Sequence, residues 1–268
     1  MAVRRTHIAS QSLRWESGVV RHPLELSQDE ALVDQATGFD AAVQRLRVGG
    51  VVVLRRVLSS EIVAALGAAA DRKFDVMTEA AAAGTIDPQD RVYLDQHAIA
   101  VDGVSAGGVD CRKWLESVFS PIAAKILGHA VTSHMFSFFR RVEPTDTEDG
   151  LGLSLPWHQD QTILQAPLVN LWVPFGACGR EAPGLELVTR RLEDRVPTET
   201  TGANVYSRGG LSIASATVQQ RFADTLWCPE FAVGDAMLFL GSTVHRTSVL
   251  PGMTKRRTSV DFRFVTAA

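Results

Sequence analysis

The chain has 268 residues, 46% of them hydrophobic, which is enough to build one enzyme domain with a sizeable core. A formal net charge of −3 and a pI near 6.2 provide no basic face for nucleic acid, so the composition favours small-molecule chemistry. No apolar run reaches the length of a signal peptide or of a membrane span, and we expect a cytoplasmic protein without a membrane partner. Three cysteines, odd in number and far apart, predict neither a zinc site nor a disulfide framework. The sequence does not indicate the oligomeric state.

The first part of the chain predicts mostly helices. Residues 1–27 are polar and mixed, so we expect a mobile arm or a strap over the surface. The apolar run 49–54 predicts a strand, and a helix is expected to follow with Ser59 as its N-cap. Its apolar residues recur at helical spacing and are Ile62, Val63, Leu66, Ala70, Phe74 and Met77. A second helix is predicted for 112–127, ending at Gly128 as its C-cap.

From Val131 onward, short apolar segments alternate with Gly, Pro, Asp and Asn, a pattern typical of a sandwich or a barrel. We expect strands at 134–142, 155–164, 168–175, 184–188, 231–240, 243–249 and 257–265. The long polar insert at 193–225 predicts a lid or a binding loop. The expected fold is therefore mainly β with flanking helices, in a single domain covering 1–268.

The most informative motif is His158-Gln159-Asp160. On a strand, residues i and i+2 share a face, so His158 and Asp160 would turn ligand atoms toward one ion while Gln159 faces away. His245 follows an apolar strand and would be the third ligand. Two imidazoles and one carboxylate on one side of an octahedral ion leave positions open, as non-haem Fe(II) oxygenases require. The triplet alone is a weak motif, and its context strengthens it.

Two neighbouring cations, Arg256 and Arg257, stand where the final strand is predicted to begin. Because side chains alternate along a strand, only one of them can face the interior. We predict that Arg256 faces inward and holds a carboxylate through its planar fork of donors, with Arg257 as the alternative. Arg140 and Arg141 pose the same question on an earlier strand, and the sequence does not decide which of them lines the pocket.

The Pro-Trp-His-Gln-Asp run at 156–160, the distal His245 and Arg256 eleven residues beyond it resemble the phytanoyl-CoA dioxygenase family of Fe(II)/2-oxoglutarate oxygenases. The likeness spans most of the chain. The strand at 49–54 and the helix after it look like the family's opening elements, and residues 183–188 look like its strand after the metal pair. The family's usual Gly-Ser-His ending of this strand is replaced here by Thr189-Arg190-Arg191. We interpret this difference as a change in a substrate-facing loop and not in the metal site.

The resemblance implies a double-stranded β-helix, which is a jelly-roll or cupin-like barrel. It also implies that His158, Asp160 and His245 hold Fe(II) and that Arg256 binds 2-oxoglutarate. Thr247 resembles a hydroxyl-bearing family position that helps to bind the same carboxylate. Likewise, Trp172 resembles an aromatic residue beside 2-oxoglutarate, although a core tryptophan would look the same.

The implied reaction consumes O2, releases succinate and CO2, and hydroxylates an unactivated C–H bond of a small molecule. Amino-acid derivatives, natural-product intermediates and acyl compounds all remain possible substrates, and desaturation or cyclisation remains an alternative outcome. Halogenating relatives lack the carboxylate ligand, so Asp160 argues against halogenation. Two other classes stay open: a zinc-type metallohydrolase, which would not need Arg256, and a catalytically silent barrel that binds a small ligand.

Overall fold

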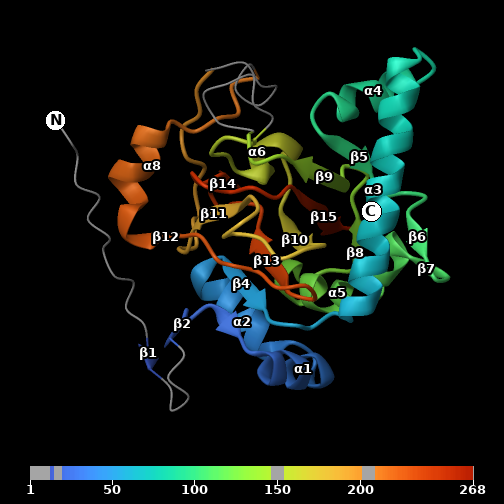
Figure 1. Ribbon diagram of the computed structural model, residues 1–268. Coiled ribbons are helices and arrows are strands. Elements are labelled where there is room, and N and C mark those ends of the chain that lie inside the picture. Colours follow the sequence, from blue (N-terminus) through green and yellow to red (C-terminus); the bar gives the residue numbers. More distant parts are fainter. Residues whose placement is uncertain (1–12, 15–19, 146–153, 201–208, 268) are drawn as a thin grey trace.

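The computed structural model describes residues 13–14, 20–145, 154–200 and 209–267 (Figure 1). Its larger sheet is built from eight strands: β3 (Glu25–Leu26), β4 (Val51–Leu54), β5 (Ala98–Ala100), β8 (Val131–Ser133), β9 (Phe138–Val142), β10 (Leu168–Pro174), β13 (Ala236–Leu240) and β15 (Arg257–Thr266). The strand order is β3-β4-β13-β10-β15-β9-β5, and β8 pairs with β15.

A smaller sheet has the order β12-β11-β14 and consists of β11 (Gly184–Val188), β12 (Leu226–Trp227) and β14 (His245–Ser248). Two further strand pairs are β1 (Leu13–Arg14) with β2 (Val20–Arg21), and β6 (Ser105–Ala106) with β7 (Val109–Asp110). Most of the larger sheet is antiparallel, and β3 with β4 is a parallel pair.

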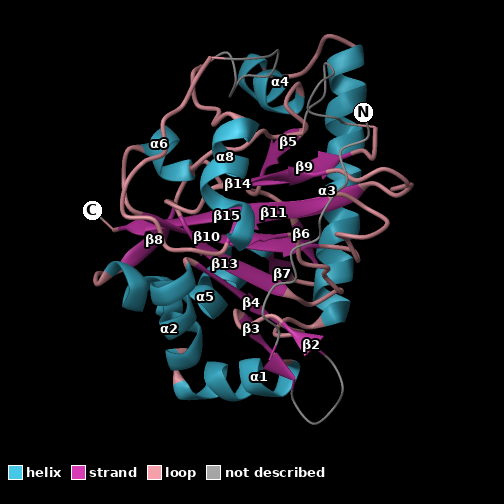
Figure 2. Cartoon of the chain, turned by 90° about the vertical axis from the view of Figure 1, so that its left-hand side faces the viewer, coloured by secondary structure: helices cyan, strands magenta, loops and turns pink. Residues whose placement is uncertain are grey.

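The helices are α1 (Gln28–Thr37), α2 (Asp40–Gly49), α3 (Ser60–Ala82), α4 (Pro88–Leu94), α5 (Cys111–Leu127), α6 (Asp160–Leu164), α8 (Ser215–Phe222) and the 3₁₀ turn η1 (Ala223–Thr225). In Figure 1, α3 and α8 lie on opposite sides of the strands. Figure 2 shows α1 and α2 at the end of the molecule where β3 and β4 lie. No helix in the described part of the chain is long and apolar enough to cross a membrane.

The two faces of the larger sheet are both buried, but against different partners. On one face, Val260, Phe262 and Phe264 of β15 belong to the core that also contains apolar residues of α3 and α5. On the other face, Trp172 of β10 packs in a second cluster together with Leu187 of the smaller sheet. Burying each such large side chain stabilises the fold by about 1.5–3 kcal/mol. The result is a helix-covered β-sandwich whose interior lies between the two sheets.

The two predicted helices are confirmed. The Ser59 hydroxyl accepts from the Ile62 amide and starts α3, and α5 ends at Gly128 in the left-handed conformation with φ 76°. The expected helical face is also correct, since its residues are buried or packed on the core. Both helices therefore act as scaffold behind the larger sheet.

Six of the predicted strand segments contain observed strands, and these are β9, β10, β11, β13, β14 and β15. The segment 155–164 is not a strand, and that prediction is wrong. His158 forms only an isolated bridge with His245, and the chain then turns into α6, with Gln159 as the residue before it. The buried Gln159 side chain explains the turn, because it donates to the Ser242 carbonyl and accepts from the Val196 amide.

The predicted arm and insert are both more ordered than expected where they are described. Residues 25–26 form β3, which extends the larger sheet beside β4; residues 1–12 and 15–19 lie outside the described chain. In the insert, α8 is anchored through Val218 and Phe222 to a cluster with Trp157, and 201–208 lie outside the described residues. The mainly β, jelly-roll class with flanking helices is confirmed, although the larger sheet does not close on itself.

Candidate active site

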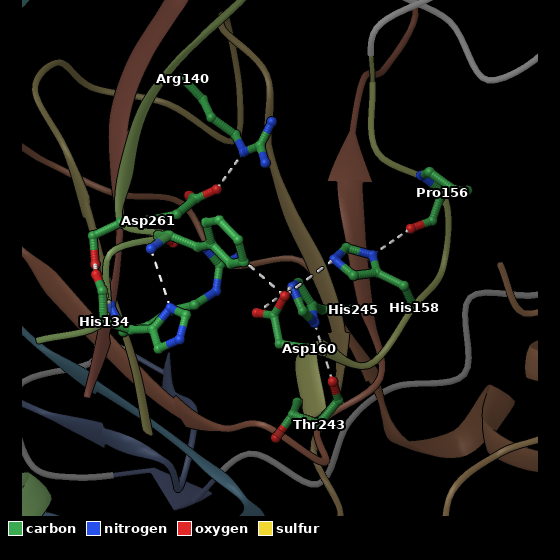
Figure 3. A network of polar contacts seen from close by, with 11 residues as sticks. His134, Arg140, Pro156, His158, Asp160, Thr243, His245 and Asp261 are labelled. Carbon is green, nitrogen blue, oxygen red and sulfur yellow. Dashed lines mark hydrogen bonds and ion pairs between the residues drawn. The ribbon is translucent and has the colours of Figure 1, made fainter. Parts of the chain in front are cut away.

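Three buried side chains come together where the chain enters α6 beside the start of β14 (Figure 3). His158 precedes α6, Asp160 is its first residue, and His245 opens β14. Their ligand atoms all lie within 4.8 Å of one another. Each imidazole Nε2 is 3.9 Å from an Asp160 carboxylate oxygen, His158 from Oδ1 and His245 from Oδ2. Two ligands of one first-row ion such as zinc are separated by at most about 4.2 Å, twice a bond of roughly 2.1 Å. Both distances from a histidine Nε2 to an Asp160 oxygen are below this limit, so the carboxylate can share an ion with each histidine.

The backbone fixes which nitrogen of each imidazole faces the centre. Nδ1 of His158 lies 2.7 Å from the Pro156 carbonyl, and Nδ1 of His245 lies 3.0 Å from the Thr243 carbonyl. A carbonyl oxygen only accepts, so each Nδ1 carries the proton and each Nε2 presents its lone pair. The two histidines are also tied to each other by backbone hydrogen bonds of 3.0 and 3.1 Å. Both rings are thus oriented before any ion binds.

Burial and charge hold the three groups in the protonation states that a metal requires. Burial lowers the pKa of His158 to about 3 and also lowers the pKa of His245, so both imidazoles are neutral near pH 7. Burial alone would raise the pKa of Asp160, but the Arg263 cation and the two histidines bring it below its ordinary value. The donor set is two neutral imidazoles and one carboxylate, which fits Fe(II) with positions left open.

A cavity extends from this centre between the sheets. Its lining mixes polar and apolar side chains from both sheets, and besides the three candidate ligands it includes Arg140, Asn170, Trp172, Phe239, Thr247, Arg257, Asp261 and Arg263. Three of the predicted site residues, His158, Asp160 and His245, line it together. Thr247 and Trp172 line it as well, so the structure brings five of the six predicted site residues to one place.

Arg256 is the exception. Its side chain is exposed and lies outside the cavity lining, so the prediction that it faces inward is wrong. Arg257 is the buried member of the pair, with 3% exposure, and lines the cavity. On β15, Arg257, Asp261 and Arg263 share the cavity side, because they are separated by even numbers of residues. Arg256 comes immediately before the strand and is an odd number of residues away from these three, so its side chain points to the opposite side.

The Arg257 guanidinium is held firmly in place. Its Nη1 donates to the Gly184 carbonyl at 2.9 Å, and its Cζ lies 5.3 Å from the ring centre of Trp172. Trp172 is 1% exposed, and its indole N–H has no acceptor within the described residues. Thr247 is 4% exposed, and its hydroxyl accepts from the Leu155 amide at 3.2 Å. A cation, a hydroxyl and an indole donor thus border one cavity.

The structure also decides between Arg140 and Arg141. Arg140 is 6% exposed, lines the cavity and pairs with Asp261 through its Nε (Figure 3). Arg141 faces the other way, toward α3, where it pairs with Asp71 and Asp75. Arg140 is therefore the pocket arginine of this strand.

Arg263 is a site residue that the sequence analysis missed. Its Nη2 donates to Asp160 Oδ1 at 3.0 Å, so it neutralises and orients the carboxylate from behind. The sequence of β15 contains the signal that could have identified Arg263, because polar and apolar side chains alternate along it. The polar residues are Arg257, Ser259, Asp261 and Arg263, and the apolar ones are Val260, Phe262 and Phe264. An apolar face packed on helices leaves the polar face for a cavity.

The comparisons with known proteins agree with this geometry. The family model described as Phytanoyl-CoA dioxygenase (PhyH) matches residues 46–249. No curated protein matches the chain. The solved structure of AviO1 from Streptomyces viridochromogenes Tue57 is similar with a TM-score of 0.60 and 17% identity, over 85% of this chain and 95% of that one.

Two further solved structures share the fold. EctD from S. alaskensis, with 2-oxoglutarate and 5-hydroxyectoine, has a TM-score of 0.60 and 15% identity over 85% of this chain and 76% of that chain. SnoK, a non-haem alpha-ketoglutarate-dependent carbocyclase from nogalamycin biosynthesis, has a TM-score of 0.56 and 18% identity over 85% and 84%. These likenesses establish the fold, and the family match covers most of the chain. The chain belongs to the phytanoyl-CoA dioxygenase family and is an Fe(II)- and 2-oxoglutarate-dependent dioxygenase that uses O2.

Proposed function

We propose that the protein hydroxylates an unactivated C–H bond of a small molecule, with release of succinate and CO2, at a centre formed by His158, Asp160 and His245. The observation that carries the proposal is the convergence of these three buried ligand atoms, with both Nδ1 protons already engaged by backbone carbonyls. Bound Fe(II), together with 2-oxoglutarate and O2, supplies the oxidation that converts the C–H bond into an alcohol. The chain's own residues supply position and charge.

Arg257 is proposed to hold the distal carboxylate of 2-oxoglutarate, in place of the predicted Arg256. Support comes from its burial, its place in the cavity lining and its fixed orientation over Trp172. A guanidinium can donate two parallel hydrogen bonds to a carboxylate, and such charge-assisted pairs are strong in a desolvated site. The Thr247 hydroxyl borders the same cavity and is proposed to add a further contact.

Trp172 and Phe239 are proposed to keep water away from the bound co-substrate. Both are buried cavity-lining side chains in the apolar cluster between the sheets. A low-dielectric wall strengthens the interaction between Arg257 and a carboxylate, because fewer water molecules screen the charges. The same wall favours a reaction in which a reactive species must not meet solvent.

The proposal is tested by adding Fe(II) and 2-oxoglutarate under anaerobic conditions. A keto acid that chelates iron through its carboxylate and keto oxygens gives a visible charge-transfer band, which we expect for the wild-type protein. His158→Ala and His245→Ala should lose the band, while His129→Ala, outside this cluster, should retain it. A folded, iron-loaded wild-type protein that gives no band would refute the assignment of the centre.

The organisation of residues 1–268 as a single domain and the location of the protein in the cytoplasm stay predictions from the sequence.

A further inference from the structure

A second cavity, of about 180 Å³, lies beside the metal centre. Three of its walls are also walls of the first cavity, namely Asp160, Arg140 and Arg263, so the two spaces meet at the iron ligand. The rest of its lining is mainly apolar and aromatic and includes Tyr93, Phe136, Phe138, Ala98, Ile163 and Leu164. The elements that form it are α4, β5, β9, α6 and β15.

The size and lining limit what this cavity can hold. An engineered apolar cavity of about 150 Å³ in another protein binds benzene. A cavity of about 180 Å³ therefore accommodates a group of single-ring size. The stacked rings of Phe136 and Phe138, with centres 6.2 Å apart, and the Tyr93 ring, 4.7 Å from Phe138, make the wall suited to a flat apolar group.

Arg140 is the polar feature that distinguishes this cavity. Its side chain is nearly fully buried, and its Nε pairs with Asp261. Its Nη1 makes one long contact of 3.5 Å with the Gln96 carbonyl, and no described residue accepts from its Nη2. A buried guanidinium with donor capacity left over is suited to an acceptor oxygen on a ligand.

The charge balance selects the kind of acceptor. Arg140 is already neutralised by Asp261, and Arg263 is already paired with Asp160. The two positive charges of bound Fe(II) would be matched by the two carboxylates of 2-oxoglutarate, so they leave no counter-charge for a further anion. A carboxylate on the ligand would add a buried anion without its own counter-charge, and a buried uncompensated charge is strongly unfavourable. A carbonyl or hydroxyl oxygen satisfies the Arg140 donor without this penalty.

We propose that this cavity binds the substrate, and that the substrate is a neutral molecule with an apolar group of single-ring size and a carbonyl or hydroxyl oxygen that accepts from Arg140. The inference rests on the proposed function, because it places the reacting carbon next to the His158, Asp160 and His245 centre. It assigns Arg140 as a specificity-determining residue. Acyl chains with a free carboxylate and cationic amino-acid derivatives become unfavourable substrates.

Three matched probes test the preference: phenylacetone, phenylacetate and phenethylamine, which share a ring and differ in the charge of the polar group. Dissociation constants are measured by ligand-observed NMR. We expect phenylacetone to bind at least about tenfold more tightly than either charged probe, a difference of about 1.4 kcal/mol. Equal or tighter binding of phenylacetate would overturn the proposal.

The role of Arg140 and Asp261 is tested by changing the charge balance. Asp261→Asn leaves the Arg140 cation without its counter-charge, so the preference should reverse toward phenylacetate. The double variant Arg140→Gln/Asp261→Asn removes both charges together and should weaken phenylacetone without creating a preference for the anion. Asp75→Asn changes an arginine-paired acid outside the cavity and serves as the control. An unchanged order of the three probes in Asp261→Asn contradicts the assignment of Arg140.

The location is tested by filling the cavity. Ile163→Trp on α6 and Ala98→Leu on β5 should each lower phenylacetone affinity at least about tenfold, whereas Met135→Trp, at a position with 70% exposure outside the lining, should not. Full affinity in both folded cavity variants would place the probe elsewhere and refute the proposal.

The metal centre is probed separately from the cavity. In protein loaded with Mn(II), relaxation of the bound phenylacetone protons should be enhanced, because the two cavities meet at Asp160. Probe binding without such enhancement, combined with no charge-transfer band with Fe(II), indicates failure of the proposed centre alone. A normal band without probe binding indicates failure of the substrate inference alone.

Discussion

Arg263 Nη2 donates to Asp160 Oδ1 across 3.0 Å, and both side chains are more than nine-tenths buried. The arginine comes from β15 and the aspartate from α6, so the contact joins the larger sheet to the short helix that carries a proposed ligand. One carboxylate oxygen is thereby held on the guanidinium, and the carboxylate as a whole is oriented toward the two histidines. Arg263 thus orients the proposed ligand Asp160 without being a proposed metal ligand itself.

Arg263→Gln should lower Fe(II) affinity by roughly 10- to 100-fold, because residues that orient metal ligands have effects of that size. The variant keeps all three ligands, so the charge-transfer band should reappear at high Fe(II) with an altered position. Fe(II) titration under anaerobic conditions measures both quantities. Arg112→Gln, an arginine paired with Asp102 on the helix side, is the control. Unchanged affinity and band position in Arg263→Gln would show that the contact has no positioning role.

Asp160→Ala should abolish succinate release that depends on substrate, because one of three protein ligands is lost. Fe(II) affinity should fall as well. The readout is succinate formed per enzyme together with bound iron, and Gln161→Ala on the same helix is the control. Chloride is expected to give little chlorinated product in the variant, since rebound also depends on substrate placement. Product formation at the wild-type rate would exclude Asp160 as a ligand.

Arg257→Gln should weaken 2-oxoglutarate while leaving Fe(II) binding largely intact. Removing one partner of a desolvated charged pair costs on the order of 2–5 kcal/mol, which corresponds to a loss of affinity of roughly 30-fold or more. Arg256→Gln is the matched control, because its side chain is exposed and should leave the affinity near the wild-type value. Titration of both variants with 2-oxoglutarate distinguishes them. A large loss in Arg256→Gln alone would restore the prediction from the sequence.

Gly67→Ala should destabilise the fold although alanine favours helices. A Cβ at this position of α3 would lie 2.7 Å from Cβ of Phe175, so the helix could not approach the sheet as it does. Overpacking costs about 1–3 kcal/mol, and the gain in helix propensity of about 1 kcal/mol offsets part of it. Urea unfolding should therefore show a net loss of about 1 kcal/mol. A variant more stable than the wild type would contradict this packing.

The sequence by itself determined the scaffold elements and the three candidate ligands. Helical spacing from Ile62 to Met77 and the glycine at 128 located α3 and α5, because these signals are local. The likeness around His158 and Asp160 identified the candidate ligands, although the local conformation predicted there was wrong. Residues 155–164 have apolar residues at both ends and place His158 and Asp160 two positions apart, which favours a strand, whereas the turn into α6 depends on contacts of Gln159 with Ser242 and Val196 far along the chain.

Only the tertiary structure decided which side chains face the cavity. Spacing from His245 pointed to Arg256, but the register of β15 against its neighbours places Arg257 inside. A shift of one residue reverses the facing of a strand, and the final register is fixed by packing Phe262 and Phe264 against the helices. The same register aligns Arg263 with Asp160. Local sequence thus specifies the elements and the ligand types, whereas the pairing of distant strands determines which cations reach them.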